Sequence, residues 1–167
     1  MNQAPAPTSF PSRPLPEAHA IFIERMGDHM EMEGMPRIAG RLFGLMLVDQ
    51  GPISFSELAE RLNVSRGSIS TNARLLESQG LILRVDVAGE RQDFFRLADR
   101  PFVNMLHGIT GHMRETMVTL EECCFDGTQS QGMTGIRATY DFFAEAVDNL
   151  EALAKRLAER NGGEIGR

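Results

Sequence analysis

The sequence predicts a mainly α-helical fold that also contains one small β-hairpin (an α+β arrangement). Apolar residues recur every three or four positions along most of the chain, as they do on the buried face of a helix. In the middle of the chain, Ser54 and Ser65 each precede a short helical pattern, and Gly80 follows the second one. Directly after Gly80 the period changes to the alternation that is typical of strands. The 167 residues suffice for one domain, or for one small domain with additional helices.

The first 16 residues are expected to form an extended or disordered arm. Five of them are proline, which lacks a backbone donor and fixes φ. Residues 17–35 are predicted to hold an N-terminal helix that ends at about Met32, because Gly34 and Pro36 break the pattern there.

A second helix is predicted from Pro36 to about Asp49. It carries Gly40 and Gly44, which lie four positions apart and therefore on one side of the helix. Because glycine has no side chain, we expect the backbone of another element to approach closely there. We favour this interpretation over a phosphate-binding role for the two glycines.

Two short helices joined by a tight turn are predicted next. Ser54 and Glu57 form a capping-box pattern, in which the serine accepts a hydrogen bond from the Glu57 amide and the glutamate reaches back. This pattern starts a helix over residues 55–62. After a two-residue turn, the second helix begins at its cap Ser65 and ends at Gly80.

A β-hairpin is predicted after the second helix. Its strands are expected over residues 82–87 and 91–97, with a turn at residues 88–90 between them. A helix, a turn, a helix and a hairpin in this order make up a winged helix-turn-helix, which we place at residues 36–100.

A C-terminal helical region is predicted over residues 101–160. Its first helix ends at about Cys124 and its second begins at Ile136, because three glycines, the last of them Gly135, interrupt the pattern between them. The tail over residues 161–167 is expected to be frayed.

The second helix of the helix-turn-helix has one apolar face and one face that fits a groove of DNA. At 100° per residue, Ile69, Ala73 and Leu76 share the apolar face. The opposite arc carries small side chains, hydroxyls, one arginine and no acid: Gly67, Ser68, Ser70, Thr71, Arg74 and Ser78. Arginine bonds guanine through two donors, and hydroxyls bond base edges or phosphates, so this arc fits the major groove. Gly67 leaves room at its centre for a close approach.

Two further residues extend the predicted DNA surface. The Ser65 hydroxyl and the free amides at the helix N-terminus suit a phosphate oxygen. Arg91, just past the predicted turn of the hairpin, suits the adjacent minor groove or its phosphates.

The charge distribution favours one basic surface on an acidic chain. The net charge is −6, although DNA binding requires local positive charge. Between residues 61 and 84, however, Glu77 is the only acid. The basic residues in this stretch are Arg61, Arg66, Arg74 and Arg84. We therefore expect the DNA footprint to be basic.

The central motifs resemble those of a known family. Residues 58–70 (LAERLNVSRGSIS) and 76–82 (LESQGLI) look like the MarR superfamily of transcription regulators. Residues 65–72 (SRGSISTN) and 36–44 (PRIAGRLFG) resemble its GbsR-like branch. The resemblance covers residues 34–100 well and the C-terminal helices in outline.

This resemblance implies a ligand-responsive repressor that binds an inverted-repeat operator in double-stranded DNA as a homodimer. The helices of residues 17–35 and 101–160 are expected to form the dimer interface. Residue by residue, it places DNA contacts on Ser65, Arg66, Ser68, Ser70, Thr71, Arg74 and Arg91. Some GbsR-like regulators respond to choline, which aromatic cages hold. With no tryptophan and only one tyrosine in the chain, we expect a different small-molecule effector.

Several classes of protein are excluded by the sequence. No apolar run approaches the roughly 18–20 residues of a membrane span, and the N-terminus lacks a secretory pattern. We therefore expect a cytoplasmic protein that does not contact a membrane. A phosphate loop, a nucleophile motif and a paired His/carboxylate arrangement are also missing, so we expect no enzyme, no cofactor and no metal site.

The cysteines and histidines leave minor alternatives open. Cys123 and Cys124 are adjacent, which excludes a disulfide framework and a zinc knuckle. They are either a redox sensor at the dimer interface or inert packing. Metal sensing by His107, His112 and Cys123 is a weaker alternative, because their spacing matches no compact site.

The alternative function is that of a winged-helix module which binds protein and not DNA. The net charge of −6 favours it. It predicts an apolar or acidic exposed face on the second short helix, whereas DNA binding predicts an affinity that falls steeply with salt.

Overall fold

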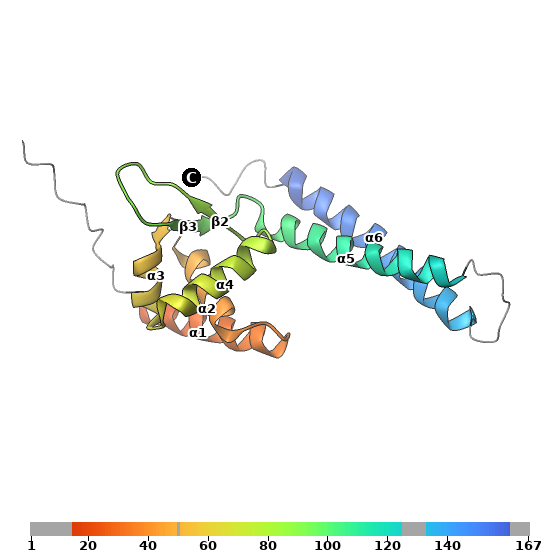
Figure 1. Ribbon diagram of the computed structural model, residues 1–167, viewed down its shortest axis with the longest axis horizontal. Helices are drawn as coiled ribbons and strands as arrows, with labels where there is room; N and C mark the ends of the chain where they lie inside the picture. The colour runs from red at the N-terminus through yellow and green to blue at the C-terminus, as the bar shows by residue number, and fades with distance from the viewer. Residues whose placement is uncertain (1–14, 50, 125–132, 161–167) are drawn as a thin grey trace, which may run out of the picture. The chain divides into compact units, whose positions relative to one another are not determined.

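The computed structural model describes residues 15–49, 51–124 and 133–160, which fall into two compact units, Met1–Ala98 and Asp99–Arg167 (Figure 1). Residues 1–14 of the predicted arm and the predicted frayed tail lie outside the described residues. Leu15, which belongs to the predicted arm, is described and packs against the core of the first unit. The mainly helical fold with a small antiparallel sheet is confirmed.

The first unit begins with two helices in close contact, α1 (Glu17–Met32) and α2 (Arg37–Val48). A Cβ atom on Gly40 would lie 2.6 Å from the Met26 carbonyl oxygen and 2.8 Å from Gly27 Cα. One on Gly44 would lie 3.1 Å from Met26 Cβ. The predicted close approach of another backbone is therefore confirmed, and the element that approaches is α1.

The helix-turn-helix consists of α3 (Phe55–Leu62) and α4 (Arg66–Ser78), and it follows the short strand β1 (Ile53–Ser54). Both predicted N-caps are formed, since Ser54 Oγ accepts from the Glu57 amide at 3.2 Å and Ser65 Oγ from the Ser68 amide at 3.1 Å. Gly80 ends α4 with a φ of 66°.

The reciprocal half of the predicted capping box is wrong. The Glu57 carboxylate turns along its own helix to Arg61, which lies one turn further on and donates to it at 3.1 Å. The charged guanidinium is the stronger partner. The Ser54 backbone belongs to β1, which pairs with the last strand of the unit.

The wing is a three-stranded antiparallel sheet of β1, β2 (Ile82–Val85) and β3 (Phe94–Leu97), in the order β1-β3-β2. Its strands are shorter than the alternation predicted, because pairing stops at Val85↔Phe94. Residues 86–93 instead form a loop in which Gly89 adopts a φ of 88°. Arg91 therefore lies in a loop and not in a strand.

The core of the first unit lies between α2, α4 and the sheet. Ile69, Ala73 and Leu76 of α4 are buried, as the helical periodicity predicted, and Leu42 of α2 and Phe95 of β3 join them. This packing fixes which side of α4 faces outward.

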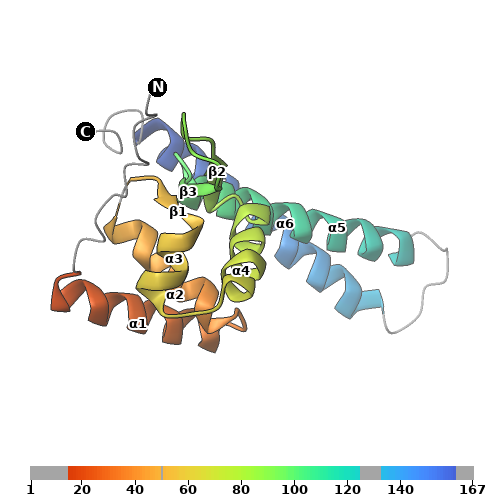
Figure 2. The same ribbon diagram turned by 60° about the vertical axis from the view of Figure 1, so that its left-hand side comes forward.

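The second unit is a pair of long helices, α5 (Pro101–Cys124) and α6 (Met133–Arg160), which lie side by side in Figures 1 and 2. Val103 and Leu106 of α5 pack against Ala154 of α6. The predicted break at Gly135 is wrong, because this glycine lies inside α6; a helix with ample packing tolerates one glycine near its start. Among the described residues, no helix is long and apolar enough to cross a membrane.

Candidate nucleic-acid interface

The outward face of α4 is small, polar and free of acidic side chains. Arg66, Gly67, Thr71 and Arg74 are exposed, and Ser68 and Ser70 are half-buried beside them. Helical periodicity placed five of these residues on this side, together with Ser78, which is also exposed; Arg66 was predicted as a contact by the family resemblance. Among the described residues, a Cβ atom on Gly67 would meet only Ser65 Oγ, at 3.8 Å, so none of them requires glycine at this position.

Ser65 lies at the start of this face and is occupied by the helix cap. Its hydroxyl accepts the Ser68 amide and lies 2.9 Å from the Ser68 hydroxyl. One of these two hydroxyls donates to the other, which leaves one hydroxyl proton for an external acceptor such as a phosphate oxygen.

Arg66 is held by contacts that the sequence did not reveal. Its Nη1 donates to Ser56 Oγ at 3.0 Å, and its Cζ lies 4.8 Å from the centre of the Phe55 ring. Ser56 in turn donates to Gln92 Oε1 at 2.9 Å. Phe55 and Ser56 belong to α3, whereas Gln92 belongs to the loop of residues 86–93 (the wing loop) and is 36 positions from Ser56. Local sequence patterns carry no signal for a contact between residues so far apart.

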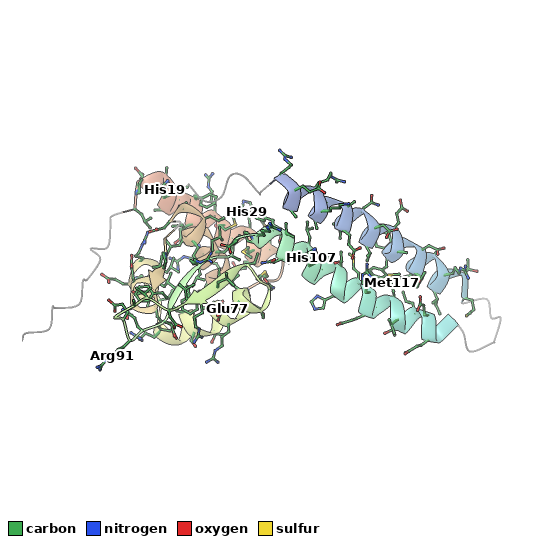
Figure 3. The ribbon with its side chains drawn as sticks, turned by 90° about the horizontal axis from the view of Figure 1, so that it is seen from above. His19, His29, Glu77, Arg91, His107 and Met117 are labelled. Atoms are coloured by element: carbon green, nitrogen blue, oxygen red, sulfur yellow. The ribbon has the colours of Figure 1, made fainter. Side chains whose placement is uncertain are left out.

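Arg74 and Arg91 are exposed, and among the described residues neither has a side-chain partner. Figure 3 shows Arg91 at the far edge of the first unit, with its side chain directed away from it. Both guanidiniums are therefore available to an external anion.

The basic surface is smaller than the residue count predicted, because two of the four arginines are neutralised inside the unit. The Arg61 side chain is only 7% exposed, and its Nη1 donates to Asp49 at 2.6 Å as well as to Glu57. Arg84 pairs with Asp93 at 3.2 Å and Glu77 at 3.7 Å. Because Asp49 and Asp93 lie outside the stretch that was counted, the count overstated the available charge. Among the described residues of α4 and of the loop 86–93, the exposed arginines without an acidic partner are Arg66, Arg74 and Arg91.

Asn72 lies on the buried side of α4. Its Nδ2 donates to the Ser68 carbonyl at 2.8 Å, whereas its Oδ1 has no hydrogen-bond partner among the described residues. The side chain is therefore tied to its own helix, and it was not among the predicted DNA contacts.

The described residues do not bring metal-ligating side chains together. No group of three or more His, Cys, Asp or Glu residues among them is arranged to hold a metal ion. His107 and His112 lie on α5. Cys123 and Cys124 are the last two residues of α5, but their side chains fall outside the described part, so their redox role stays a prediction.

Comparison with known proteins agrees with this geometry. The MarR family profile matches residues 33–92, which span the helix-turn-helix and most of the wing. The whole structure is similar to a crystal structure of a transcriptional regulator, with a TM-score of 0.76 and 32% sequence identity. That match covers 85% of this chain and 99% of the other. Residues 33–92 of the chain belong to the MarR family.

Two curated relatives match about half of the chain. The HTH-type transcriptional regulator MmpR5 of Mycobacterium tuberculosis is 48% identical over 82 residues, which are 48% of this chain and 50% of that protein. The HTH-type transcriptional repressor OpcR of Bacillus subtilis is 28% identical over 78 residues, 47% of this chain and 42% of that protein. The aligned part spans half or less of each relative. Both relatives are named for transcriptional regulation, which agrees with the prediction of a regulator that is not an enzyme.

Proposed function

We propose that this chain binds double-stranded DNA as a homodimer, with α4 in the major groove and the wing loop beside it. The observation that carries the proposal is the outward face of α4, which presents hydroxyl groups, one glycine and two arginines and has no acidic side chain. An acid-free helix face of this kind avoids repulsion by phosphates and offers donors to base edges.

Each predicted contact residue has a distinct role in the proposal. Arg74, with no internal partner, reads a base through its guanidinium, and the small residues next to it bring the helix close to the groove. Arg66 and Arg91 contact phosphates, and Arg91 approaches the minor groove. The full set of proposed DNA-contacting residues is Ser65, Arg66, Gly67, Ser68, Ser70, Thr71, Arg74 and Arg91.

The second unit supports dimerisation through its exposed apolar side chains. On α5, Phe102 is 43% exposed and Val118 is 53% exposed; on α6, Phe142 is 64% exposed. Helices that leave such large apolar groups in solvent gain free energy by covering them, and a second copy of the pair provides a matching surface. A homodimer places two α4 helices on an inverted repeat with half-sites about 34 Å apart.

We further propose that the protein is a ligand-responsive repressor of the GbsR-like branch. The motifs of residues 36–44 and 65–72 support the branch, and the relative OpcR is itself named a repressor. In the first unit a cleft of about 340 Å³ lies between α1 and the end of α3. Leu15, Ile21 and Leu62 are among its apolar lining residues. A small molecule bound there touches both the N-terminal helix and the first helix of the helix-turn-helix, so it can shift the population of DNA-competent dimers.

Selection of genome fragments by the purified protein, followed by footprinting, tests this function. Enrichment of fragments that share a protected inverted repeat supports the homodimeric regulator, and the neighbouring genes direct the search for the effector. If folded, dimeric protein enriches no fragment, the proposal is contradicted. The protein-binding alternative, which the net charge of −6 favours, then takes its place.

A further inference from the structure

Ser56 joins three parts of the first unit through one hydroxyl group. Its Oγ accepts a hydrogen bond from Arg66 Nη1 at 3.0 Å and donates one to Gln92 Oε1 at 2.9 Å. Arg66 is the first residue of α4, Ser56 lies in the first turn of α3, and Gln92 belongs to the wing loop. The two bonds run in one direction, so each polarises the other.

Aromatic rings also contact the arginine that Ser56 binds. The Arg66 guanidinium lies 4.8 Å from the centre of the Phe55 ring, and this ring lies 6.4 Å from that of Phe95 in β3. Arg84 lies 5.6 Å from the other ring of the pair. Two cations thus lie over a pair of tilted rings, and the contact with Phe55 restricts the rotamers of Arg66.

We propose that Ser56 and Gln92 are positioning residues for DNA binding. Ser56 accepts from Arg66 directly and Gln92 accepts from Ser56, a chain of hydrogen bonds that we call the clasp. Through it, the first turn of α4 and the wing loop meet the DNA backbone as one unit. This inference rests on the proposed function. Gln92 is the neighbour of Arg91, so the bond that fixes Gln92 also limits where the exposed Arg91 guanidinium can lie.

The clasp leaves Arg66 able to bind a phosphate. Arginine has five N–H donors, and Ser56 receives one hydrogen bond from it. A long side chain that is already ordered before binding loses less conformational entropy when it meets its target. Without the clasp, Arg66 and the wing loop each have to be ordered by the DNA itself.

The test measures binding of the full-length protein to a fluorescently labelled duplex of random sequence, over a series of salt concentrations. Random sequence suffices because phosphate contacts do not depend on sequence. We expect S56A and Q92A each to weaken binding about three- to tenfold, the loss that corresponds to one hydrogen bond. In R66A, the slope of log affinity against log salt should be smaller by about one for each bound recognition helix. S56A and Q92A should reduce the slope toward the value of R66A.

Three variants separate positioning from a structural effect. S56T keeps the hydroxyl and should restore binding. In the R66A background, S56A should cause a smaller loss than in the parent, because only its indirect effect on Arg91 through Gln92 remains. T139A also removes a hydroxyl, one that bonds only to its own helix α6, and should bind as the parent does. Thermal unfolding checks that each variant is folded. If S56A does not fold, Q92A, which changes a residue of the wing loop, tests the same inference.

Each result decides the question. If R66A weakens binding but S56A and Q92A bind with the affinity and salt slope of the parent, the clasp is irrelevant to DNA and the inference is wrong. It is equally wrong if S56A costs as much in the R66A background as in the parent. If the parent itself binds no duplex even at low salt, the proposed function fails and the inference fails with it.

Discussion

Gly67→Ala tests whether the glycine at the centre of the outward face of α4 is needed for folding or for DNA binding. Among the described residues, the new methyl group meets only Ser65 Oγ, at an ordinary contact distance of 3.8 Å. Alanine also favours a helix over glycine by up to about 1 kcal/mol. We therefore expect the variant to be as stable as the parent or slightly more stable, with a melting temperature raised by at most about 4–8 °C in a unit of this size.

DNA binding should change in the opposite direction. If the α4 backbone lies against the walls of the groove, the added methyl group forces a displacement that costs about 1–3 kcal/mol, as overpacking does in a protein core. This cost corresponds to an affinity about 5–150-fold lower. Circular dichroism measures the stability, and fluorescence anisotropy with the selected operator measures the affinity.

Gly40→Ala is the matched control, because the same substitution there meets backbone. Its methyl carbon would lie 2.6 Å from the Met26 carbonyl oxygen, so α1 and α2 must separate, and we expect a loss of about 1–3 kcal/mol in the free energy of unfolding. The reasoning is refuted if Gly67→Ala binds the operator as tightly as the parent does, or if it destabilises the fold as much as Gly40→Ala.

Three other predictions follow from the charged and phenolic groups. Arg74→Ala should weaken operator binding by about 1–3 kcal/mol and relax the preference at one base position, which a selection with a randomised operator would reveal; equal losses on all sequences would contradict base reading. Arg61→Ala should lower the free energy of unfolding in urea by about 1–3 kcal/mol, because it removes the buried donor to Asp49, while the folded variant keeps its DNA affinity; weaker DNA binding with unchanged stability would overturn the internal assignment. The hydrogen bond from Tyr140 to the Glu121 carboxylate (2.6 Å) raises the pKa of the phenol above its usual 10.0. The stability that this bond provides is therefore present below pH 10.0 and is lost as the pH rises through the raised pKa of the folded protein. Since the chain has one tyrosine and no tryptophan, phenolate absorbance during an alkaline titration reports this group alone; its midpoint should fall toward 10 in Glu121→Gln, and an unchanged midpoint would exclude the bond.

The boundaries of α3 and α4 could be predicted because local chemistry determines them. Ser54 and Ser65 begin α3 and α4 by accepting an amide three positions further on, and Gly80 ends α4 in the left-handed conformation that glycine favours. The outward face of α4 followed from periodicity alone, since Ile69 and its neighbours had to be buried together.

What the sequence could not provide depends on residues that are distant in the chain. Alternation extended the strands beyond Val85, but it does not show where pairing between strands stops. A count of charges included Arg61 among the free cations, although Asp49 neutralises it across the fold. The contact of Ser56 with Gln92 likewise has no local signature. The polar contacts that shape the site join residues far apart in the sequence, whereas the helices that carry them are determined by residues close together in the sequence.

The central claim is that the outward face of α4 occupies the major groove and that the wing loop lies at the minor groove. Methylation protection with dimethyl sulfate tests it directly, because this reagent attacks guanine N7 in the major groove and adenine N3 in the minor groove. With the selected operator, the account predicts protection of guanine N7 in both half-sites, lost at one position per half-site in Arg74→Ala. Adenine N3 protection beside each half-site should be lost in Arg91→Ala. If saturating protein leaves guanine N7 as reactive as in free DNA, α4 is not in the major groove and the account is contradicted.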